Sequence, residues 1–395
     1  MDSRPDAGFP APDGTMDGML EDPWYLNHAR YGLPTRAVAD TVQALVAAAM
    51  RGGPTASTEL HGEHLRARDG VARLTGVPAE RVALTTSTSQ GLVQVAFGLR
   101  GEVLVSLDEF PANVYPWRRA EAAGRLRVRA LPGSGTGSDS NAGSFPPVTP
   151  ERIADALTPA VSVVAVSAVD FRTGYRADLA GIREVIGADR VLVVDGIQGF
   201  GAIDADWSPA DVLVVGGQKW LRAGWGSGFM AFSERGLARV EPTLGSWAGA
   251  EDQARYDGTI HPLLEGAERH AVTNLSPFTS GALATALEGI AATGIGAISV
   301  QIASTAGRLA DAIDAAGLAL LSPRSPAERA GIVVAGYPAG QAIEAHARLV
   351  AAGITVTLHG DDRIRFSPHS TTPDETVDRV AELLEIGRIG ATYPL

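Results

Sequence analysis

The sequence predicts an α/β protein, with a mostly parallel central sheet in a large domain and a smaller α+β domain at the C-terminal end. Short runs rich in valine and leucine, without strict polar and apolar alternation, are typical of strands covered on both faces. Helical segments such as PERIADAL and ADLAGIREVIG separate these runs, as expected for right-handed crossovers between parallel strands. At 395 residues the chain also exceeds the length at which one hydrophobic core stops growing.

The expected elements follow in a regular order along the chain. A helical pattern begins near Thr35, a second helix spans HLRARDGVARLTG, and the strand-like runs come after them. Ligands of parallel sheets bind at the carboxyl ends of the strands, so the residues that follow each run are candidates for a site. The expected strands are Val103 to Leu107, Arg125 to Leu131, Val161 to Val169, Val191 to Asp195 and Asp211 to Gly216.

The composition along the chain indicates how it divides into domains. Residues 1–18 are polar and rich in proline and glycine, which predicts a flexible tail, and residues 19–265 form the large domain, whose N-terminal segment could pack on the small one. Residues 266–395 contain amphipathic helices and short strands around GIVVAG and RIRFS, as expected for the smaller domain. The segment 132–147, PGSGTGSDSNAGSFPP, lacks a periodic apolar face and predicts a surface loop.

Charge and composition limit the classes of partner. The net charge is −12, the pI is near 5.2 and no basic cluster stands out, which argues against a nucleic-acid or anionic membrane surface. No apolar run reaches membrane-spanning length and the N-terminus does not resemble a signal peptide, so we expect a cytoplasmic protein with a small-molecule substrate. The absence of cysteine removes disulfides, thiol nucleophiles, persulfide carriers and thiolate-metal sites, and we expect no metal centre.

Lys219 is the only lysine among the 33 lysines and arginines of the chain. A coding bias towards arginine explains the depletion of lysine, but it does not explain which lysine is kept. A guanidinium stays protonated, whereas the amine of a lysine can act as a nucleophile and form an imine. The sole lysine is therefore a candidate for covalent chemistry.

Asp195 ends one expected strand, and Lys219 follows the next strand along the chain. Neighbouring parallel strands would place both at one edge of the sheet, where pyridoxal 5′-phosphate (PLP) needs a carboxylate and an amine. Asp195 would keep the pyridine nitrogen protonated, while Lys219 would form a Schiff base with the aldehyde and move the α-proton. Gln198, in the following turn, would bond the phenolic oxygen of the cofactor. Taken alone, Asp195 could be a strand-end or capping carboxylate and Gln198 a solvated turn residue.

Two further motifs lie where strands end. In VALTTSTSQGL a strand passes into a helix, so Thr88 and Ser89 would offer hydroxyl and N–H groups to a phosphate, although capping without a ligand is the alternative. In LVSLDEFPANVYPW, Phe110 could lie against a flat cofactor with Asn113 as a polar contact, whereas a lone phenylalanine usually belongs to the core.

Together these motifs resemble the class V aminotransferase group of fold-type I PLP-dependent enzymes, which includes cysteine desulfurases, kynureninases and isopenicillin-N-epimerase-like proteins. The resemblance covers almost the whole chain and rests on YLNHARYGLP, STSQG, DEFPANVYPW, VVDGIQGFG, GGQKWL and IRFSPHSTTPDETVD, in that order. It implies the fold-type I transferase fold, with Lys219 as the internal aldimine, Asp195 as the partner of the pyridine nitrogen and Gln198 as the partner of the phenolic oxygen. The resemblance further implies Phe110 as the stacking residue, with Thr88, Ser89 and Gln218 as phosphate ligands.

The resemblance also implies a substrate site and a second subunit. Arg365 lies at the family's position for the substrate carboxylate, which a guanidinium can hold through two parallel hydrogen bonds; on its own it would be a surface arginine. Ser276, in TNLSPFTSG, resembles a residue that reaches the cofactor phosphate of the neighbouring subunit, which implies a homodimer with composite active sites. His28 and Arg30, in the N-terminal motif, could line the substrate entrance or lie at the surface.

Departures from the family pattern leave the reaction open. Gln218 cannot be a general acid, and Gly216 replaces a serine of many relatives, so one phosphate hydroxyl is absent. The absence of cysteine argues against a desulfurase that carries persulfide on its own thiol. The expected activity is that of a class V aminotransferase acting on an amino acid. The alternatives are a β-lyase of the C–S lyase or kynureninase type, an amino-acid epimerase and a catalytically inactive binding protein.

Overall fold

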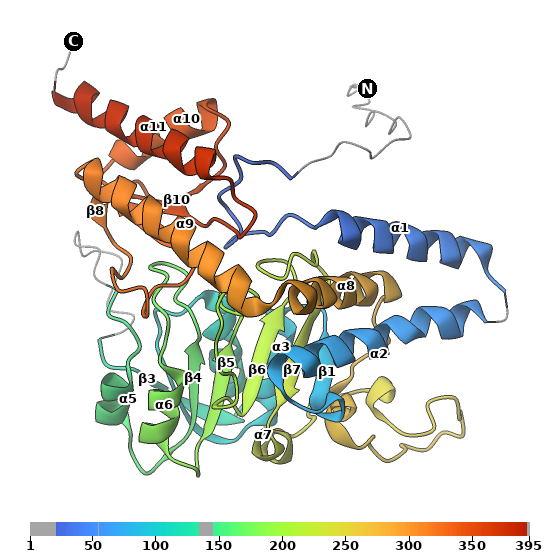
Figure 1. Cartoon of the computed structure of the whole chain (residues 1–395). Coiled ribbons are helices and arrows are strands. Elements are labelled where there is room, and N and C mark those ends of the chain that lie inside the picture. Colours follow the sequence, from blue (N-terminus) through green and yellow to red (C-terminus); the bar gives the residue numbers. More distant parts are fainter. Residues whose placement is uncertain (1–20, 54, 134–144, 393–395) are drawn as a thin grey trace, which may run out of the picture.

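A seven-stranded sheet forms the centre of the structure, a computed structural model that describes residues 21–53, 55–133 and 145–392 (Figure 1). The strand order is β1-β7-β6-β5-β4-β2-β3, and β6, β5, β4, β2 and β3 run parallel. β7 is antiparallel to both of its neighbours, β6 and β1. The strands are β1 (Val82–Thr85), β2 (Gly101–Val105), β3 (Leu126–Ala130), β4 (Val161–Ser167), β5 (Val191–Asp195), β6 (Val212–Gly216) and β7 (Gly228–Phe232).

All five strands expected from the sequence are present, as β2 to β6, and the mostly parallel α/β sheet is confirmed. β7 was not expected, because its sequence GFMAF begins with glycine and contains no β-branched residue. Its reversed direction lets β1 run the same way as β6. The carboxyl ends of β1, β2, β4, β5 and β6 therefore lie at one edge of the sheet.

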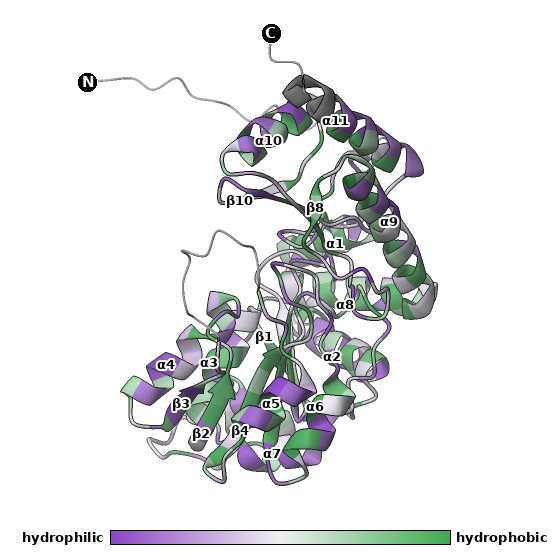
Figure 2. Ribbon diagram, turned by 90° about the vertical axis from the view of Figure 1, so that its left-hand side faces the viewer, coloured by the Kyte–Doolittle hydropathy of each residue, from purple (hydrophilic) through white to green (hydrophobic). Residues whose placement is uncertain are grey.

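Helices cover both faces of the sheet, which explains why its strands are apolar on both sides (Figure 2). Residues that alternate along β4 face opposite ways: Val163 packs with the core beneath α3 and α4, and Val164 with the core beneath α2, α5, α6 and α8. The helices of this part are α1 (Arg36–Arg51), α2 (Ala56–Thr75), α3 (Thr88–Gly98), α4 (Tyr115–Ala122), α5 (Pro150–Ala156), α6 (Leu179–Ile186), α7 (Glu234–Arg239) and α8 (Pro277–Thr293).

A second, antiparallel sheet lies in the C-terminal part, with the strand order β10-β11-β9-β8. Its core also contains Leu26, because the N-terminal segment makes single β-bridges at Tyr25 and Asn27 to Thr355 and Ser367. The N-terminal segment thus packs on this smaller sheet. The elements are β8 (Ala319–Leu320), β9 (Val333–Gly336), β10 (Thr357–His359), β11 (Arg363–Phe366), α9 (Ile295–Ala315), α10 (Gln341–Ala351) and α11 (Asp374–Thr392).

The domain division at residue 265 stays a prediction. α8 follows that point in the sequence, yet it packs on α1 and α2 and contributes Leu283 and Leu287 to the core of the central sheet. The expected tail 1–18 and most of the loop 132–147 lie outside the described residues. In the described ranges no single helix is long and apolar enough to span a membrane, although α8 and α9 together, bent by 84°, pass that test.

Candidate active site

The residues that follow the strands meet at the carboxyl edge of the central sheet. Asp195 is the last residue of β5 and Lys219 lies three residues after β6. The neighbouring strand ends lead to Thr88 at the start of α3, to Phe110 after β2 and to Ser167 at the end of β4. The expected convergence of an acid, an amine and a helix N-terminus is therefore present in the structure.

Asp195 and Lys219 interact electrostatically in a buried setting. Burial raises the pKa of Asp195 from 3.8 to about 6, against the opposing effects of the Ile197 N–H, 3.0 Å from Oδ1, and of the Lys219 charge. Burial lowers the pKa of Lys219 from 10.5 to about 8; the Asp195 carboxylate opposes this shift and Arg365 adds to it. A lysine with a lowered pKa offers more of its nucleophilic, neutral amine at physiological pH.

Phe110 lies beside Lys219, because the Lys219 Nζ atom is 5.3 Å from the centre of its ring. The Phe110 ring is 42% exposed and packs edge-on against Phe171, with 5.1 Å between ring centres. One face of a flat ligand could therefore lie on Phe110 while Lys219 reaches its edge.

Thr88 and Gln218 converge on Gly216, the last residue of β6. A methyl group added at Gly216 would lie 2.5 Å from Gln218 Oε1, 2.8 Å from Thr88 Oγ1 and 3.2 Å from the Thr88 nitrogen. Ser87 caps α3 by accepting a hydrogen bond from the Gln90 N–H at 3.1 Å, which leaves the buried Thr88 hydroxyl without a partner. We call Gly216, Gln218 and Thr88 together the Gly216 cradle. Its polar groups at the N-terminus of α3 suit an anion. Ser89 is exposed in the first turn of α3.

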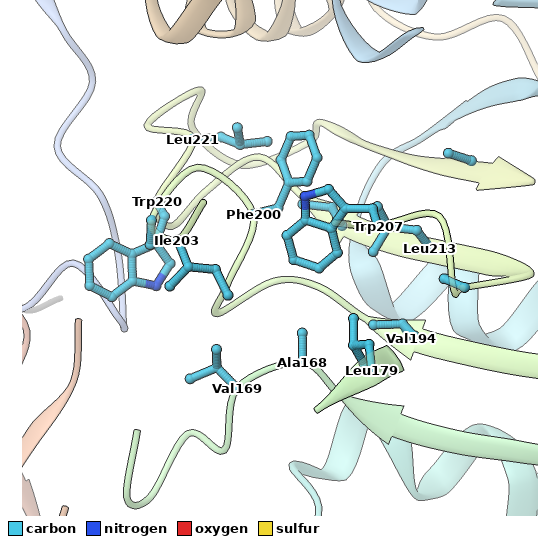
Figure 3. Packing of buried hydrophobic residues seen from close by; sticks show 14 of the residues in the cluster. Ala168, Val169, Leu179, Val194, Phe200, Ile203, Trp207, Leu213, Trp220 and Leu221 are labelled. Carbon is cyan, nitrogen blue, oxygen red and sulfur yellow. The ribbon is translucent and has the colours of Figure 1, made fainter. Parts of the chain in front are cut away.

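Gln198 holds the turn after β5 against two other segments. Its Nε2 donates to the Ala29 carbonyl at 2.9 Å, and its Oε1 accepts from the Trp220 Nε1 at 2.8 Å. Trp220 is 1% exposed and lies, with Leu221, in the same core as Ile203 (Figure 3). The two residues after Lys219 thus anchor its turn, and one N–H of the Gln198 amide is left for a ligand.

Arg365 is 4% exposed on β11 and has no acidic partner in the described part of the chain. Its Nη1 donates to the Phe171 carbonyl at 3.0 Å, while its Nε is buried without a partner. Burial, together with the charge of Arg30, lowers the pKa of Arg365 to about 10. A buried guanidinium that lacks a counter-ion favours an anionic ligand.

Three further expected site residues differ in their surroundings. His28 is 1% exposed and packs against Tyr25 and His369, with 5.1 and 5.0 Å between ring centres. Asn113 is fully buried, and its Oδ1 accepts from the Trp117 Nε1 at 3.2 Å. Ser276 is exposed at the start of α8, where its side chain makes no capping hydrogen bond.

Glu109, which was not expected from the sequence, holds the Phe110 segment against the sheet. Its carboxylate accepts a hydrogen bond from the Ser167 N–H at 3.0 Å and another from the Ser167 hydroxyl. Ser167 is the register partner of Asp195. Burial raises the pKa of Glu109 to about 7, with Asp195 acting in the same direction. The sequence position of Glu109 could have indicated its role, because this residue directly precedes the expected stacking residue after a buried strand.

The constellation fits PLP. The partnerless Thr88 hydroxyl and the Gly216 cradle suit its phosphate, Asp195 suits its ring nitrogen, and Lys219 suits its aldehyde. Phe110 supplies an apolar face beside the amine.

Comparisons with known proteins agree with this arrangement. A family model described as Aminotransferase class-V matches residues 34–362. Isopenicillin N epimerase of Streptomyces clavuligerus is 30% identical over 343 residues, 81% of this chain and 83% of its own, and kynureninase of Deinococcus radiodurans is 28% identical over 310 residues, 75% and 71%. A structure of C-DES with glycine covalently linked to its PLP cofactor superposes with a TM-score of 0.81, at 21% identity, over 92% of this chain and 96% of that one.

Proposed function

Because the chain belongs to the aminotransferase class-V family and is a PLP-dependent enzyme, we propose that it transfers the amino group of an amino acid through chemistry at Lys219. The observation that carries this proposal is the meeting of the sole lysine with Asp195 at one edge of the sheet, where each alters the pKa of the other. The alternative of a catalytically inactive binding protein is disfavoured, because Lys219, Asp195 and Gln198 are all present and perturbed pKa values cluster at catalytic sites.

Each part of the constellation has a role in holding the cofactor. Lys219 would hold it covalently, Asp195 would bind its ring nitrogen, and Gln198 would donate its free N–H to the phenolic oxygen. The Gly216 cradle would bind the phosphate, with the exposed Ser89 within the same helix turn. When bound, PLP supplies a ring that accepts the electron pair of a bond broken at the substrate's α-carbon.

Transamination needs only one group that moves a proton between two carbon atoms on the same side of the cofactor. The neutral amine of Lys219 would take the proton from the α-carbon, and the ammonium form would deliver it to the aldehyde carbon of the cofactor, on the other side of the nitrogen that joins the two. Phe110 beside it offers no proton, and Gln218 offers no acid. Epimerisation by two bases would require a second proton donor on the opposite side of the substrate. Neither Phe110 nor Gln218 can act as that donor.

A test of the cofactor site can use the fact that the chain has one lysine. The protein, loaded with PLP, is treated with borohydride, and the site of covalent attachment is located by peptide mass. We expect one equivalent of PLP at Lys219, an absorbance band that borohydride removes, and neither result in Lys219→Arg, which keeps the charge but cannot form an imine. Wild-type protein that stays colourless with PLP would refute the proposal.

A β-lyase of the kynureninase type is a second candidate, favoured by Phe110 in the stacking position and by the 28% identity to a kynureninase. The two reactions differ in their need for a keto acid. With an amino acid alone, a transaminase releases at most one equivalent of keto acid per site, whereas a lyase continues to turn over. Continued release of a leaving group without added keto acid would replace our proposal by the lyase.

We also propose a homodimer with composite sites. Leu65, Trp247 and Leu263 are 58%, 51% and 48% exposed, and Leu65 lines a cavity of about 580 Å³ between α2 and residues 248–280. Large exposed apolar groups of this kind favour a protein interface. If Ser276 completes the partner's phosphate site, Lys219→Ala and Ser276→Asp chains, each inactive, should regain activity when mixed. A monomer in solution, or no recovery from a mixture that forms mixed dimers, would contradict this proposal.

A further inference from the structure

Two arginines near Lys219 lack acidic partners in the described residues, and they differ in their surroundings. Arg365 is buried, and its charge lowers the pKa of Lys219. Arg30 is exposed, and its charge acts on the pKa of Arg365. Two cations in electrostatic contact repel one another, and an anionic ligand relieves this repulsion.

Hydrogen bonds on either side of Arg30 hold its backbone at the same site. The preceding residue, Ala29, donates its N–H to the Ser367 hydroxyl at 3.0 Å and accepts from Gln198 at 2.9 Å. Two residues further on, the Gly32 N–H donates to the Gln218 carbonyl at 2.8 Å. The backbone of Arg30 is therefore held between the turn after β5, the lysine turn and the end of β11.

Close packing explains why this segment cannot move away. A methyl group at Gly32 would lie 1.9 Å from the Lys219 carbonyl oxygen, so only glycine permits the contact. The Arg222 Nε also donates to the Leu33 carbonyl at 2.6 Å. Arg30 is thus an exposed side chain on a fixed backbone, which suits it to a ligand at the mouth of the site.

The neighbouring charges do not neutralise these two arginines. Arg363, two residues from Arg365 on β11, pairs with Asp362 at 3.2 Å, and Arg172 pairs with Asp170 at 2.8 Å. His359 has a pKa lowered to about 4 by burial and by the two β11 arginines, so it is neutral at physiological pH. In the described residues neither Arg30 nor Arg365 has a carboxylate partner, and the α-carboxylate of an ordinary amino acid can pair with only one of them.

We propose that the substrate is an amino acid with a second carboxylate in its side chain, which Arg30 binds while Arg365 holds the α-carboxylate. This inference rests on the proposed function and specifies its substrate class. Arg30 is exposed and its side chain must be ordered, so its contribution is smaller than that of a buried pair. Arg30 determines the specificity for the side chain, while Arg365 binds the α-carboxylate of every amino-acid substrate.

Binding of amine-free analogues to the PLP-loaded enzyme tests the inference without turnover. Glutarate and pentanoate have the same chain length and differ in one carboxylate, and their Kd values can be measured by calorimetry. We expect glutarate to bind about threefold to tenfold more tightly, with the ratio falling as salt rises. The same comparison of succinate with butyrate, and of adipate with hexanoate, shows which distance between two carboxylates the site prefers.

Variants assign the preference to Arg30. Arg30→Met should reduce the ratio of the pentanoate Kd to the glutarate Kd to about one, and Arg30→Lys should keep part of the preference. Arg365→Met should weaken the binding of both ligands. Arg118→Met, which removes an exposed arginine of α4 paired with Glu121, is the matched control and should change neither Kd.

Each outcome has one meaning. If PLP binds but all three dicarboxylates bind no better than their monocarboxylate partners, the inference is wrong while the proposed function stands. Equal weakening of both ligands in Arg30→Met would mean that Arg30 assists the α-carboxylate, which also overturns it. Failure to load PLP at all would refute the proposed function itself.

Discussion

Lys219 should react as an amine near neutral pH, far below the range of an ordinary lysine. With its pKa at about 8 instead of 10.5, about one molecule in 11 carries the neutral amine at pH 7, compared with about one in 3,000 for an unperturbed side chain. The structure therefore predicts an enrichment of the reactive form by about 300-fold at that pH. The causes are burial and Arg365, which together outweigh the attraction of Asp195.

The assay is the pH dependence of acetylation of the cofactor-free protein by acetic anhydride. Because the chain has one lysine, the mass of a single peptide reports the reaction. The midpoint should lie near pH 8 in the wild type, below that in Asp195→Asn, where an attracting carboxylate is lost, and above it in Arg365→Leu, where a like charge is lost. A wild-type midpoint near 10.5, or an upward shift in Asp195→Asn, would show that the reasoning is wrong.

Stability gives an independent check of the same pKa shift. Between pH 8 and 10.5 the folded chain binds fewer protons at Lys219 than the unfolded chain, so the free energy of unfolding should rise with pH across that window. Lys219→Met, which cannot titrate, is the reference. The free energy of unfolding of the cofactor-free wild type, measured in urea, should therefore rise relative to that of Lys219→Met as the pH increases, and a constant difference would contradict a lowered pKa.

Three further predictions concern the supports of the site. Gly216→Ala should weaken PLP binding at least about tenfold, because its methyl group would enter the Gly216 cradle; an unchanged Kd would contradict the proposed phosphate site. Glu109→Gln and Ser167→Ala should each raise the Kd for PLP about tenfold, and the double variant should do little more, since both act on the hydrogen bond from the Ser167 hydroxyl to the Glu109 carboxylate. Leu287→Ala should lower the free energy of unfolding by about 2–5 kcal/mol in urea, and a loss below about 1 kcal/mol would contradict its place in the core.

Local signals predicted the strands and the centre of the site. Val191 to Asp195 and the run before Gly216 are apolar on both sides, and such runs need helices on both faces of a sheet. Parallel order then brings Asp195 and Lys219 to one edge, since each follows a neighbouring strand. β7 escaped prediction because GFMAF gains its pairing from β1 and β6 and carries little strand preference of its own.

Contacts distant in sequence escaped prediction for a different reason. The burial of His28 against His369 joins segments that no local pattern connects, and the bonds of Glu109 to Ser167 depend on the order of β2 and β4 in the sheet. The same is true of Gln198, whose amide is shared between Ala29 and Trp220. Such contacts depend on which elements become neighbours.

The sequence by itself determined the α/β class, the strand ends at which the candidate site lies and the one lysine that could form an imine there, because periodicity and side-chain chemistry are local properties. Only the tertiary structure decided the lowered pKa of Lys219, the hydrogen bonds of Glu109 to Ser167 and the electrostatic interaction of Arg30 with Arg365. Burial and electrostatic interaction act through space, and the packing of the N-terminal segment on the lysine turn brings these groups together.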